Sequence, residues 1–484
     1  MSSEIRLLKP TILWNHFADL NDVPRPSKKE ERVIAFIKNF GEGLGLETIV
    51  DKTGNIIIKK PATEGMENRK TVLLQSHIDM VHQKNSDVQF DFDNDPIQSY
   101  IDGDWVKAKG TTLGSDNGIG VAAAMSVLSS KDITHGPIEA LFTIDEETGM
   151  TGAFGLEPGL LDAEIMLNMD SEDEGELYIG CAGGIDTLAT INYTAESAPS
   201  THIAFKVFVS GLKGGHSGID IPLGRGNSNK ILNRLLNEVL GDIRIAHLDG
   251  GSLRNAIPRE AHAIITLDSS KKEEVLGKME ALGEDIKKEL QTTEPNLTFT
   301  FTSTTLPEKV IDTDSADRIV KAIYACPNGV IRMSADIEGL VETSTNLARI
   351  ITENNSFRME SLQRSSVDSA KKDLANMIRS VFELAGAKVD HRGAYPGWKP
   401  NPHSPILEVM KGIYEKEFDK VPDVKAIHAG LECGIINSKY PQLDCISFGP
   451  TIRHPHSPDE KVNIETVEKF WFFLLETLKR IPVK

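Results

Sequence analysis

The sequence predicts an α/β fold in which a mostly parallel sheet presents polar side chains at the carboxyl ends of its strands. In the first third of the chain, short apolar runs typical of buried strands alternate with helical patterns. Several of these runs end directly in clusters of His, Asp and Glu. Near residue 186 the pattern changes to alternating strands and long charged helices, which is typical of an α+β domain. We therefore expect an α/β domain that is interrupted by an inserted α+β domain.

The composition is that of an ordinary globular protein and disfavours several functional classes. The chain has 484 residues and a formal net charge of −18, which argues against nucleic acid and anionic membranes as partners, because both need a basic face. No window approaches the roughly 18 apolar residues of a membrane span. The N-terminus lacks a signal-peptide pattern, and the few cysteines form no Cys-x-x-Cys pair. We expect a soluble, cytoplasmic protein.

The first predicted elements are two helices and two strands. Apolar residues at helical spacing predict a helix over residues 11–20. Ser27 and Glu30 form a capping box that opens a second helix, which ends near two glycines. The short runs 46–50 and 55–58 predict two strands joined by a turn.

Three apolar runs that follow predict strands with polar residues at their ends. The carboxyl ends of parallel strands meet at one edge of a sheet, so we expect these residues to lie together. They are His77 and Asp79 after the run 72–75, Glu146 and Glu147 after 138–144, and Asp170 after 165–169.

Asp116 lies in a glycine-rich turn, residues 110–120, which leads into an alanine-rich helix at 119–130. The turn has some likeness to a dinucleotide-binding loop. It follows an acidic loop rather than a strand, however, and its carboxylate would repel a pyrophosphate. We expect Asp116 to join the polar residues at the strand ends instead.

The domain boundaries are predicted at 1–186 and 393–484 for the first domain and at 187–392 for the insertion. The first domain resumes with a helix at 405–418, strands at 424–429 and 443–448, and a final helix at 464–480. The elements expected in the insertion are strands at 203–209, 261–267 and 296–303, helices at 226–240 and 271–290, and further elements at 316–325, 340–352, 356–365 and 369–385.

Taken together, the polar residues suit a hydrolytic site with two metal ions. Such a site needs about three protein ligands per ion, with the ions about 3.5–4 Å apart, and one bridging carboxylate can serve both. Each residue alone has an ordinary explanation as a turn or surface residue, and spacing does not choose between His454 and His456. The ligands that fit zinc, with manganese or cobalt as alternatives, are His77, Asp116, Glu147, Asp170 and His456.

Two carboxylates remain for other roles. Asp79, two residues after His77, can accept the second imidazole N–H and fix the tautomer. Glu146 is adjacent to a ligand and can accept a proton from water and pass it to a leaving amine. The sequence contains none of three other catalytic motifs. These are the serine-hydrolase elbow, the His-Glu-x-x-His motif of zinc peptidases and the phosphate-binding loop.

The chain resembles the M20 family of metallopeptidases, in its aminoacyl-histidine dipeptidase (carnosinase-like) branch. The matching stretches cover nearly the whole chain in the order that the family has. They lie at 23–27, 76–82, 109–120, 145–149, 168–176, 214–218, 430–434 and 449–462.

The resemblance implies a zinc-peptidase-like three-layer α/β/α domain with an inserted lid or dimerisation domain. It implies that Asp116 bridges the ions, with His77 and Asp170 at one and Glu147 and His456 at the other. Glu146 would be the general base, Asp79 would orient His77, and the peptide after Asp116 would be cis. The ending His-Ser-Pro-Asp-Glu selects His456, which leaves His454 as a bystander or substrate contact.

Four further residues are expected to contact substrate. The resemblance implies that His216 stabilises the oxyanion, from the same chain or from a second subunit, and that Asn255 contacts substrate. Arg358 is a candidate for the substrate's carboxylate and Glu432 for its amino group, although both also fit a surface role.

The predicted function is metal-dependent hydrolysis of dipeptides, including aminoacyl-histidine dipeptides, by a homodimeric enzyme. Another activity of the same family, such as a tripeptidase, N-acyl amino acid deacylase or carboxypeptidase, would share the metal site and differ in the lid. A non-catalytic metal-binding protein on the same fold would lack a ligand or the base, and no such loss is visible in the sequence.

Overall fold

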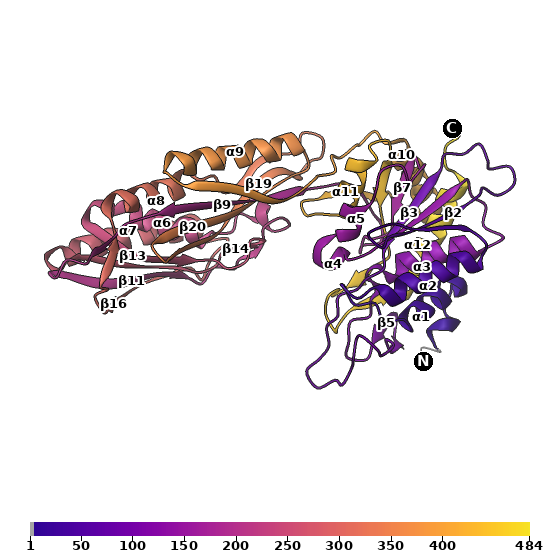
Figure 1. Ribbon diagram of the computed structural model, residues 1–484, viewed down its shortest axis with the longest axis horizontal. Helices are drawn as coiled ribbons and strands as arrows, with labels where there is room; N and C mark the ends of the chain where they lie inside the picture. Colours follow the sequence, from indigo (N-terminus) through magenta and orange to yellow (C-terminus); the bar gives the residue numbers. More distant parts are fainter. Residues whose placement is uncertain (1–3) are drawn as a thin grey trace. The chain divides into compact units, whose positions relative to one another are not determined.

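A computed structural model describes residues 4–484 (Figure 1). The chain divides into two compact units. Unit 1 comprises the described residues up to Gly180 together with Pro400–Ala426 and Leu431–Lys484, and unit 2 comprises Cys181–Lys399 and Ile427–Gly430. The boundaries expected after residues 186 and 392 lie a few residues from these divisions. The short return of the chain to unit 2 at Ile427–Gly430 was not expected.

Unit 1 is built on an eight-stranded sheet in the order β1-β2-β6-β3-β7-β23-β8-β22. Its four central strands run parallel, and their side chains are almost all buried, which explains why they read as continuous apolar runs. The flanking pairs are antiparallel, so the sheet is mixed. The strands are β1 (Glu47–Val50), β2 (Ile56–Lys60), β3 (Val72–His77), β6 (Ile138–Thr143), β7 (Ile165–Asn168), β8 (Glu176–Cys181), β22 (Asp423–Ile427) and β23 (Asp444–Ser447).

Helices pack on this sheet and confirm the predicted α/β architecture (Figure 1). Helix α3 is buried over nearly its whole length because it packs between α1 and β3, which explains its many alanines. The helices are α1 (Thr11–Asn21), α2 (Glu31–Gly43), α3 (Ser115–Ser129), α4 (Glu146–Gly149), α5 (Thr151–Gly155), α10 (Pro405–Phe418), α11 (Glu432–Lys439) and α12 (Ile464–Lys479).

A small second sheet in unit 1 fixes the segment that carries His456. Its order is β24-β25-β5-β4, and β25 pairs with β5 through Val462 and Val106. His456 lies in the connection between β24 and β25. The strands are β4 (Ser99–Asp102), β5 (Trp105–Ala108), β24 (Ile452–Arg453) and β25 (Lys461–Asn463).

Unit 2 contains two repeats of a β-α-β-β-α-β pattern in one nine-stranded sheet. Eight of the strands follow the order β16-β11-β15-β13-β19-β20-β9-β21, so the second half mirrors the first across the β13–β19 pair. The ninth strand, β18 (Gly329–Met333), pairs with β19 outside this order. Repeat 1 is β11 (His202–Ser210), α6 (Ser228–Glu238), β13 (Ile243–Gly250), β15 (Ala261–Asp268), α7 (Lys272–Leu290) and β16 (Thr298–Thr304). Repeat 2 is β9 (Gly183–Asn192), α8 (Thr313–Ala325), β19 (Val341–Glu353), β20 (Ser356–Ser365), α9 (Asp368–Leu384) and β21 (Lys388–Tyr395).

The two faces of the unit 2 sheet differ. One face packs against α6, α7, α8 and α9 and forms the apolar core, with side chains such as Val207, Ile265 and Phe357 fully buried (Figure 1). Alternate residues of β11, β13 and β15 point the other way and are only partly buried. We call this second surface the open face of the unit 2 sheet.

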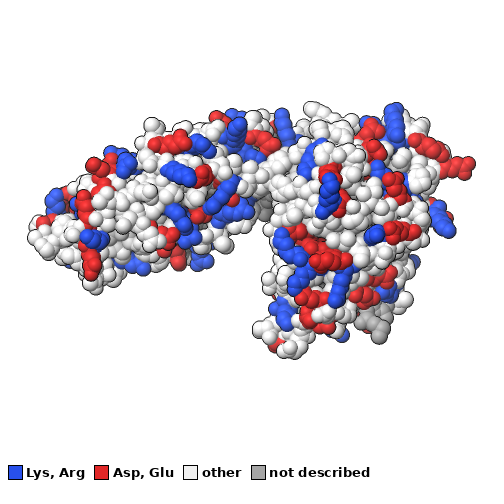
Figure 2. Space-filling view, viewed as in Figure 1, with Lys and Arg blue, Asp and Glu red and all other residues white. Residues whose placement is uncertain are grey.

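The surface of both units mixes the two signs of charge. On the face drawn in Figure 2, basic and acidic side chains are interspersed over the whole area. Within residues 4–484, no helix combines the length and the apolar character that crossing a membrane requires.

Candidate metal centre

The parallel strands of unit 1 bring the predicted polar residues to one edge of the sheet. His77 is the last residue of β3 and lies opposite Thr143 at the end of β6. Glu146 and Glu147 begin α4, directly after β6, and Asp170 follows β7, which pairs with β3 on its other side. The strand register therefore explains why residues far apart in the sequence meet.

The turn that carries Asp116 is held by the carboxylate of Glu460. This carboxylate accepts hydrogen bonds from the backbone N–H groups of Leu113 at 2.7 Å, Gly114 at 3.0 Å and Ser115 at 2.7 Å. Gly114 has a φ of 69°, a conformation that favours glycine. The peptide between Asp116 and Asn117 is cis, as the resemblance implies. The turn thus presents Asp116 at the start of α3.

The two oxygens of Asp116 face two different histidines. Its Oδ1 lies 3.3 Å from Nε2 of His77, and its Oδ2 lies 3.3 Å from Nε2 of His456. Nε2 of His77 is also 3.3 Å from Asp170, and Nε2 of His456 is 3.0 Å from Glu147. The result is two groups of three potential ligands that share Asp116. Of the two neighbouring histidines, the structure places His456, and not His454, beside these carboxylates.

The carboxylates of this cluster lie close together, so a positive charge among them would be stabilised. Burial raises the pKa of Glu147 and Asp170, and the nearby carboxylate of Asp116 adds to both shifts. Burial lowers the pKa of His77, but the charge of Asp170 and hydrogen bonds to carboxylates raise it well above its ordinary value. Hydrogen bonds to Asp116 and Glu147 raise the pKa of His456 to about 11. Divalent cations would relieve the repulsion among the carboxylates.

The donor set fits two divalent ions. Each group offers three imidazole or carboxylate ligands, the number and type that zinc and similar metals take in hydrolytic sites. Oε1 of Glu147 is buried and has no hydrogen-bond partner among the described residues, so this oxygen is available as a ligand. The carboxylate of Asp116 lies between the two groups, where a bridging ligand belongs.

Asp79 occupies a position from which it can orient His77. Nδ1 of His77 lies 3.1 Å from the backbone carbonyl oxygen of Asp79 and 3.3 Å from its Oδ1, which leaves Nε2 directed at Asp116 and Asp170. The Asp79 carboxylate is itself fixed by hydrogen bonds from the Ser27 hydroxyl at 2.8 Å and the Glu146 backbone N–H at 3.0 Å.

Glu146 lies within the cluster and its carboxylate makes no hydrogen bond to a described residue. One carboxylate oxygen of Glu146 lies within 4.8 Å of a potential ligand atom of His77 and of Glu147. Burial raises its pKa well above the ordinary value; His77 opposes this shift, and Asp170 and Glu432 reinforce it. A carboxyl group with a raised pKa beside a metal cluster can hold a proton between two steps of a reaction.

Glu432 is not a surface residue. It begins α11, its side chain is buried, and its Oε2 accepts hydrogen bonds from Gln75 at 2.7 Å and Thr143 at 2.6 Å. Its Oε1 is buried without a hydrogen-bond partner among residues 4–484. Burial raises the pKa of Glu432 to about 7. One oxygen of the carboxyl group is therefore available to a ligand.

His216 and Asn255 lie side by side in unit 2. The Ser217 N–H donates to the Asn255 carbonyl at 2.8 Å, and His216 pairs with Ala256 in a short two-stranded sheet. Nδ1 of His216 accepts hydrogen bonds from the N–H groups of Gly218 and Ile219 at 3.2 and 3.1 Å. The proton of the neutral ring is therefore on Nε2, which can donate to an oxyanion. Burial lowers the pKa of His216, with Arg364 contributing, and favours this neutral form.

The structure does not bring Arg358 together with His216 and Asn255. Arg358 pairs with Glu353 at 3.4 Å near the end of β20 that turns into β19. Arg364 lies six residues further along this extended strand, a distance of about 20 Å. It is Arg364 whose charge acts on His216 and on His428, and its Nη1 donates to the Tyr395 hydroxyl at 2.9 Å.

Several residues that support the site were not assigned by sequence reasoning. Glu460 holds the Asp116 turn, and the buried Arg25 donates to the Gly114 carbonyl at 2.7 Å. Asn117 donates to both Met169, at 2.7 Å, and Asp170. Burial and the charges of Asp116 and Asp170 raise the pKa of Glu172 to about 8. All four residues lie within the stretches that match the family. Their place in these stretches is the feature of the sequence by which they could have been found.

Comparison with known proteins identifies the family. Residues 73–480 match the model of peptidase family M20/M25/M40. The chain is 47% identical to the cytosol non-specific dipeptidase of Escherichia coli K12 over 485 aligned positions, covering 100% of both chains. The crystal structure of aminoacylhistidine dipeptidase from Vibrio alginolyticus superposes with a TM-score of 0.96 at 48% identity, covering 99% of this chain and 98% of that one.

A more distant structure shares the fold. Aminopeptidase PepT from Bacillus cereus aligns with a TM-score of 0.58 at 16% identity over 98% of this chain and 99% of its own. The family match and the full-length relatives agree with the resemblance drawn from the motifs. The chain belongs to peptidase family M20/M25/M40.

Proposed function

We propose that the protein is a metal-dependent dipeptidase with a two-metal site in unit 1. The observation that carries this proposal is the pair of ligand groups that share Asp116. The two full-length relatives are named dipeptidases, which supports this substrate class. Aminoacyl-histidine dipeptides are expected among a broad range of substrates.

The ions would be held by the five residues described above. His77 and Asp170 would bind one, Glu147 and His456 the other, and Asp116 both, with zinc as the expected metal. When bound, the ions supply Lewis acidity, which polarises the peptide carbonyl and makes water more acidic. Asp79 would keep His77 in the tautomer whose Nε2 lone pair faces the ion.

Glu146 would carry the proton through the reaction. Its carboxylate accepts a proton from the attacking water and later delivers it to the nitrogen of the leaving amine. Burial raises the pKa of Glu146, which favours the protonated form that this role requires. Oε1 of Glu432, which has no hydrogen-bond partner among the described side chains and backbone groups, would receive the free amino group of the dipeptide.

Unit 2 would supply the remaining substrate contacts as a lid. His216 would donate from Nε2 to the oxygen of the tetrahedral intermediate, with Asn255 beside it. We assign the substrate's C-terminal carboxylate to Arg364 in place of Arg358, because Arg364 is the arginine whose charge acts on His216. We expect the protein to form a homodimer in the cytoplasm, and light scattering of the purified protein tests the dimer. A mixture of His216→Ala and Glu146→Gln chains tests whether His216 acts within its own chain, because turnover by the mixture requires that one chain supplies His216 to the other.

Glu146→Gln is the decisive test of the chemistry. The variant should retain both metal ions and lose about 10²–10⁴-fold in kcat, the usual contribution of a general acid–base. Metal content by mass spectrometry and hydrolysis of a panel of dipeptides, tripeptides and N-acyl amino acids measure the two properties. Full turnover in the variant would refute the role of Glu146. Preference for a tripeptide or an N-acyl amino acid would replace the dipeptidase assignment by another activity of the family.

A further inference from the structure

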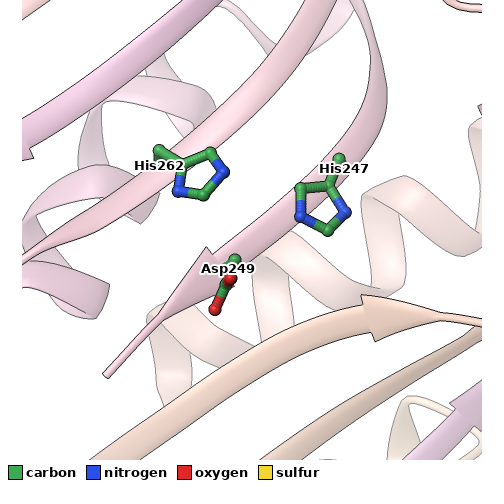
Figure 3. Close-up of side chains that lie close together, drawn as sticks. All are labelled: His247, Asp249 and His262. Carbon is green, nitrogen blue, oxygen red and sulfur yellow. The ribbon is translucent and has the colours of Figure 1, made fainter. Parts of the chain in front are cut away.

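Unit 2 contains a second group of histidine and carboxylate side chains, on the open face of its sheet. His247 and Asp249 belong to β13 and His262 belongs to the neighbouring strand β15 (Figure 3). The three side chains lie close together, and all are half-buried. One ligand atom from each lies within 4.8 Å of the others, the spacing of groups that can hold a metal ion.

A β-bulge places these residues on the same face. Before the bulge, Ile243 and Ile245 of β13 point into the apolar core. The register then shifts between Ile245 and His247, and Leu248 becomes the next core residue. Without the extra residue, His247 and Asp249 would continue the core face of the strand. Bulges are used in this way to redirect side chains at functional sites.

The strand pairing fixes the relative positions of the three residues. Asp249 lies directly opposite His262 in the antiparallel pair of β13 and β15. The ring centroids of His247 and His262 are 5.5 Å apart, with an angle of 49° between the rings, so they are not stacked. Because all three are borne by paired strands, their geometry does not depend on a loop.

Thr352 prepares His247 to act as a ligand. The Thr352 hydroxyl donates to the Leu248 carbonyl at 3.3 Å and lies 3.0 Å from Nδ1 of His247. In the tautomer in which Nδ1–H donates to this hydroxyl, the lone pair of His247 is on Nε2. Metal-binding histidines are oriented by this kind of hydrogen bond from the second ring nitrogen.

Among the described residues, no basic side chain forms an ion pair with Asp249. Its carboxylate makes no ion pair or side-chain hydrogen bond with residues 4–484 that would neutralise it. The nearby Lys206 is directed over the ring of Phe208, with its Nζ 5.3 Å from the ring centre. Asp249 and His262 line a pocket of about 670 Å³, which gives an ion and its water ligands access to the group.

We propose that His247, Asp249 and His262 bind a divalent transition-metal ion, with Zn²⁺ as the expected occupant. Two imidazoles and one carboxylate are suitable ligands for zinc, and the fourth position would face the pocket and hold water. The ion would link β13 to β15 and stabilise unit 2. It is separate from the two ions proposed for unit 1, and hydrolysis does not require it.

Counting metal ions in the full-length protein tests this site. Apo-protein prepared with a chelator is reloaded with Zn²⁺, and bound zinc per chain is measured by mass spectrometry after removal of free metal. The wild type should hold three ions and His262→Gln two, with unchanged kcat at saturating zinc. His202→Gln is the matched control, because His202 is a half-buried histidine of the same sheet, bonded to Thr266 at 3.0 Å, outside the group. It should retain three.

A second measurement isolates the new site from the proposed catalytic pair. In Asp116→Ala, zinc should still raise the thermal midpoint of unfolding, and adding His262→Gln should abolish that rise. Equal zinc content with and without His262→Gln would overturn the proposal, as would an equal rise in the midpoint. The midpoints without metal show whether His262→Gln itself disturbs folding.

Discussion

The two histidine–carboxylate groups of this protein have similar side chains but stand on different kinds of sheet. In unit 1 the candidate ligands come from the ends of parallel strands and from the Asp116 turn; His77 is buried, the three carboxylates are half-buried and His456 is exposed. In unit 2 the group stands on the face of an antiparallel sheet and is half-buried. In each group, an oxygen atom contacts Nδ1 of one histidine. Asp79 provides this oxygen for His77, and Thr352 provides it for His247. Several carboxylates lie close together in unit 1 and suit the reactive site that we propose, whereas one carboxylate on a rigid sheet suits a structural ion.

Asp116→Ala should have the largest effect and should separate the two groups. One carboxylate serves both ions of unit 1, so its loss should remove both and reduce dipeptide hydrolysis below detection. The ion proposed for unit 2 should remain, which gives one zinc per chain by mass spectrometry. Retention of two or more ions would mean that Asp116 does not bridge.

Glu460→Gln should have an intermediate effect, confined to unit 1. The amide cannot accept all the N–H groups that the carboxylate accepts, so the Asp116 turn should be held less firmly. We expect the zinc concentration for half-maximal activity to rise about 10–100-fold, as is usual when a supporting residue is lost. Excess zinc should restore kcat. Glu468→Gln, an exposed position on α12, is the control, and an equal response of the two variants would exclude the positioning role.

Thr352→Val should have the smallest effect and should be confined to unit 2. Loss of the hydroxyl removes the acceptor for Nδ1 of His247 while keeping the shape of the side chain. We expect zinc affinity of the unit 2 group to fall about 10-fold, with turnover unchanged. Competition with a chromogenic chelator in the Asp116→Ala background measures this affinity. An unchanged value would show that Thr352 does not set the tautomer of His247.

The site of unit 1 was largely predictable because parallel strands have a simple geometry. Buried strands read as apolar runs, and their carboxyl ends must meet, so His77, Glu147 and Asp170 could be grouped from spacing alone. His456 arrives from the far end of the chain on a separate small sheet, and only the family motif selected it over His454. The role of Glu460 in holding the Asp116 turn was not predicted. In the sequence, a buried carboxylate that accepts hydrogen bonds from a turn cannot be distinguished from an acidic residue on the surface.

Unit 2 was less predictable for physical reasons. The strand β13 was not anticipated, because the bulge after Ile245 breaks the alternation by which strands are recognised. The substrate contact expected of Arg358 stays a prediction, because β20 carries two arginines and the sequence does not say which end of the strand lies near His216. The duplication could not be seen as a sequence period, because repeat 1 is inserted within repeat 2.

This nesting of the repeats affects the order in which unit 2 can form. Repeat 1 is one continuous segment, and the most distant residues that its strands pair are Ala204 and Thr304. Repeat 2 must close β9 onto β20, joining Asn192 to Ser356 across the whole of repeat 1. Contacts between residues distant along the chain form slowly, because a long loop must first be closed. Repeat 1 can therefore complete its own half of the sheet and then offer the edge of β13 as a template on which β19 assembles.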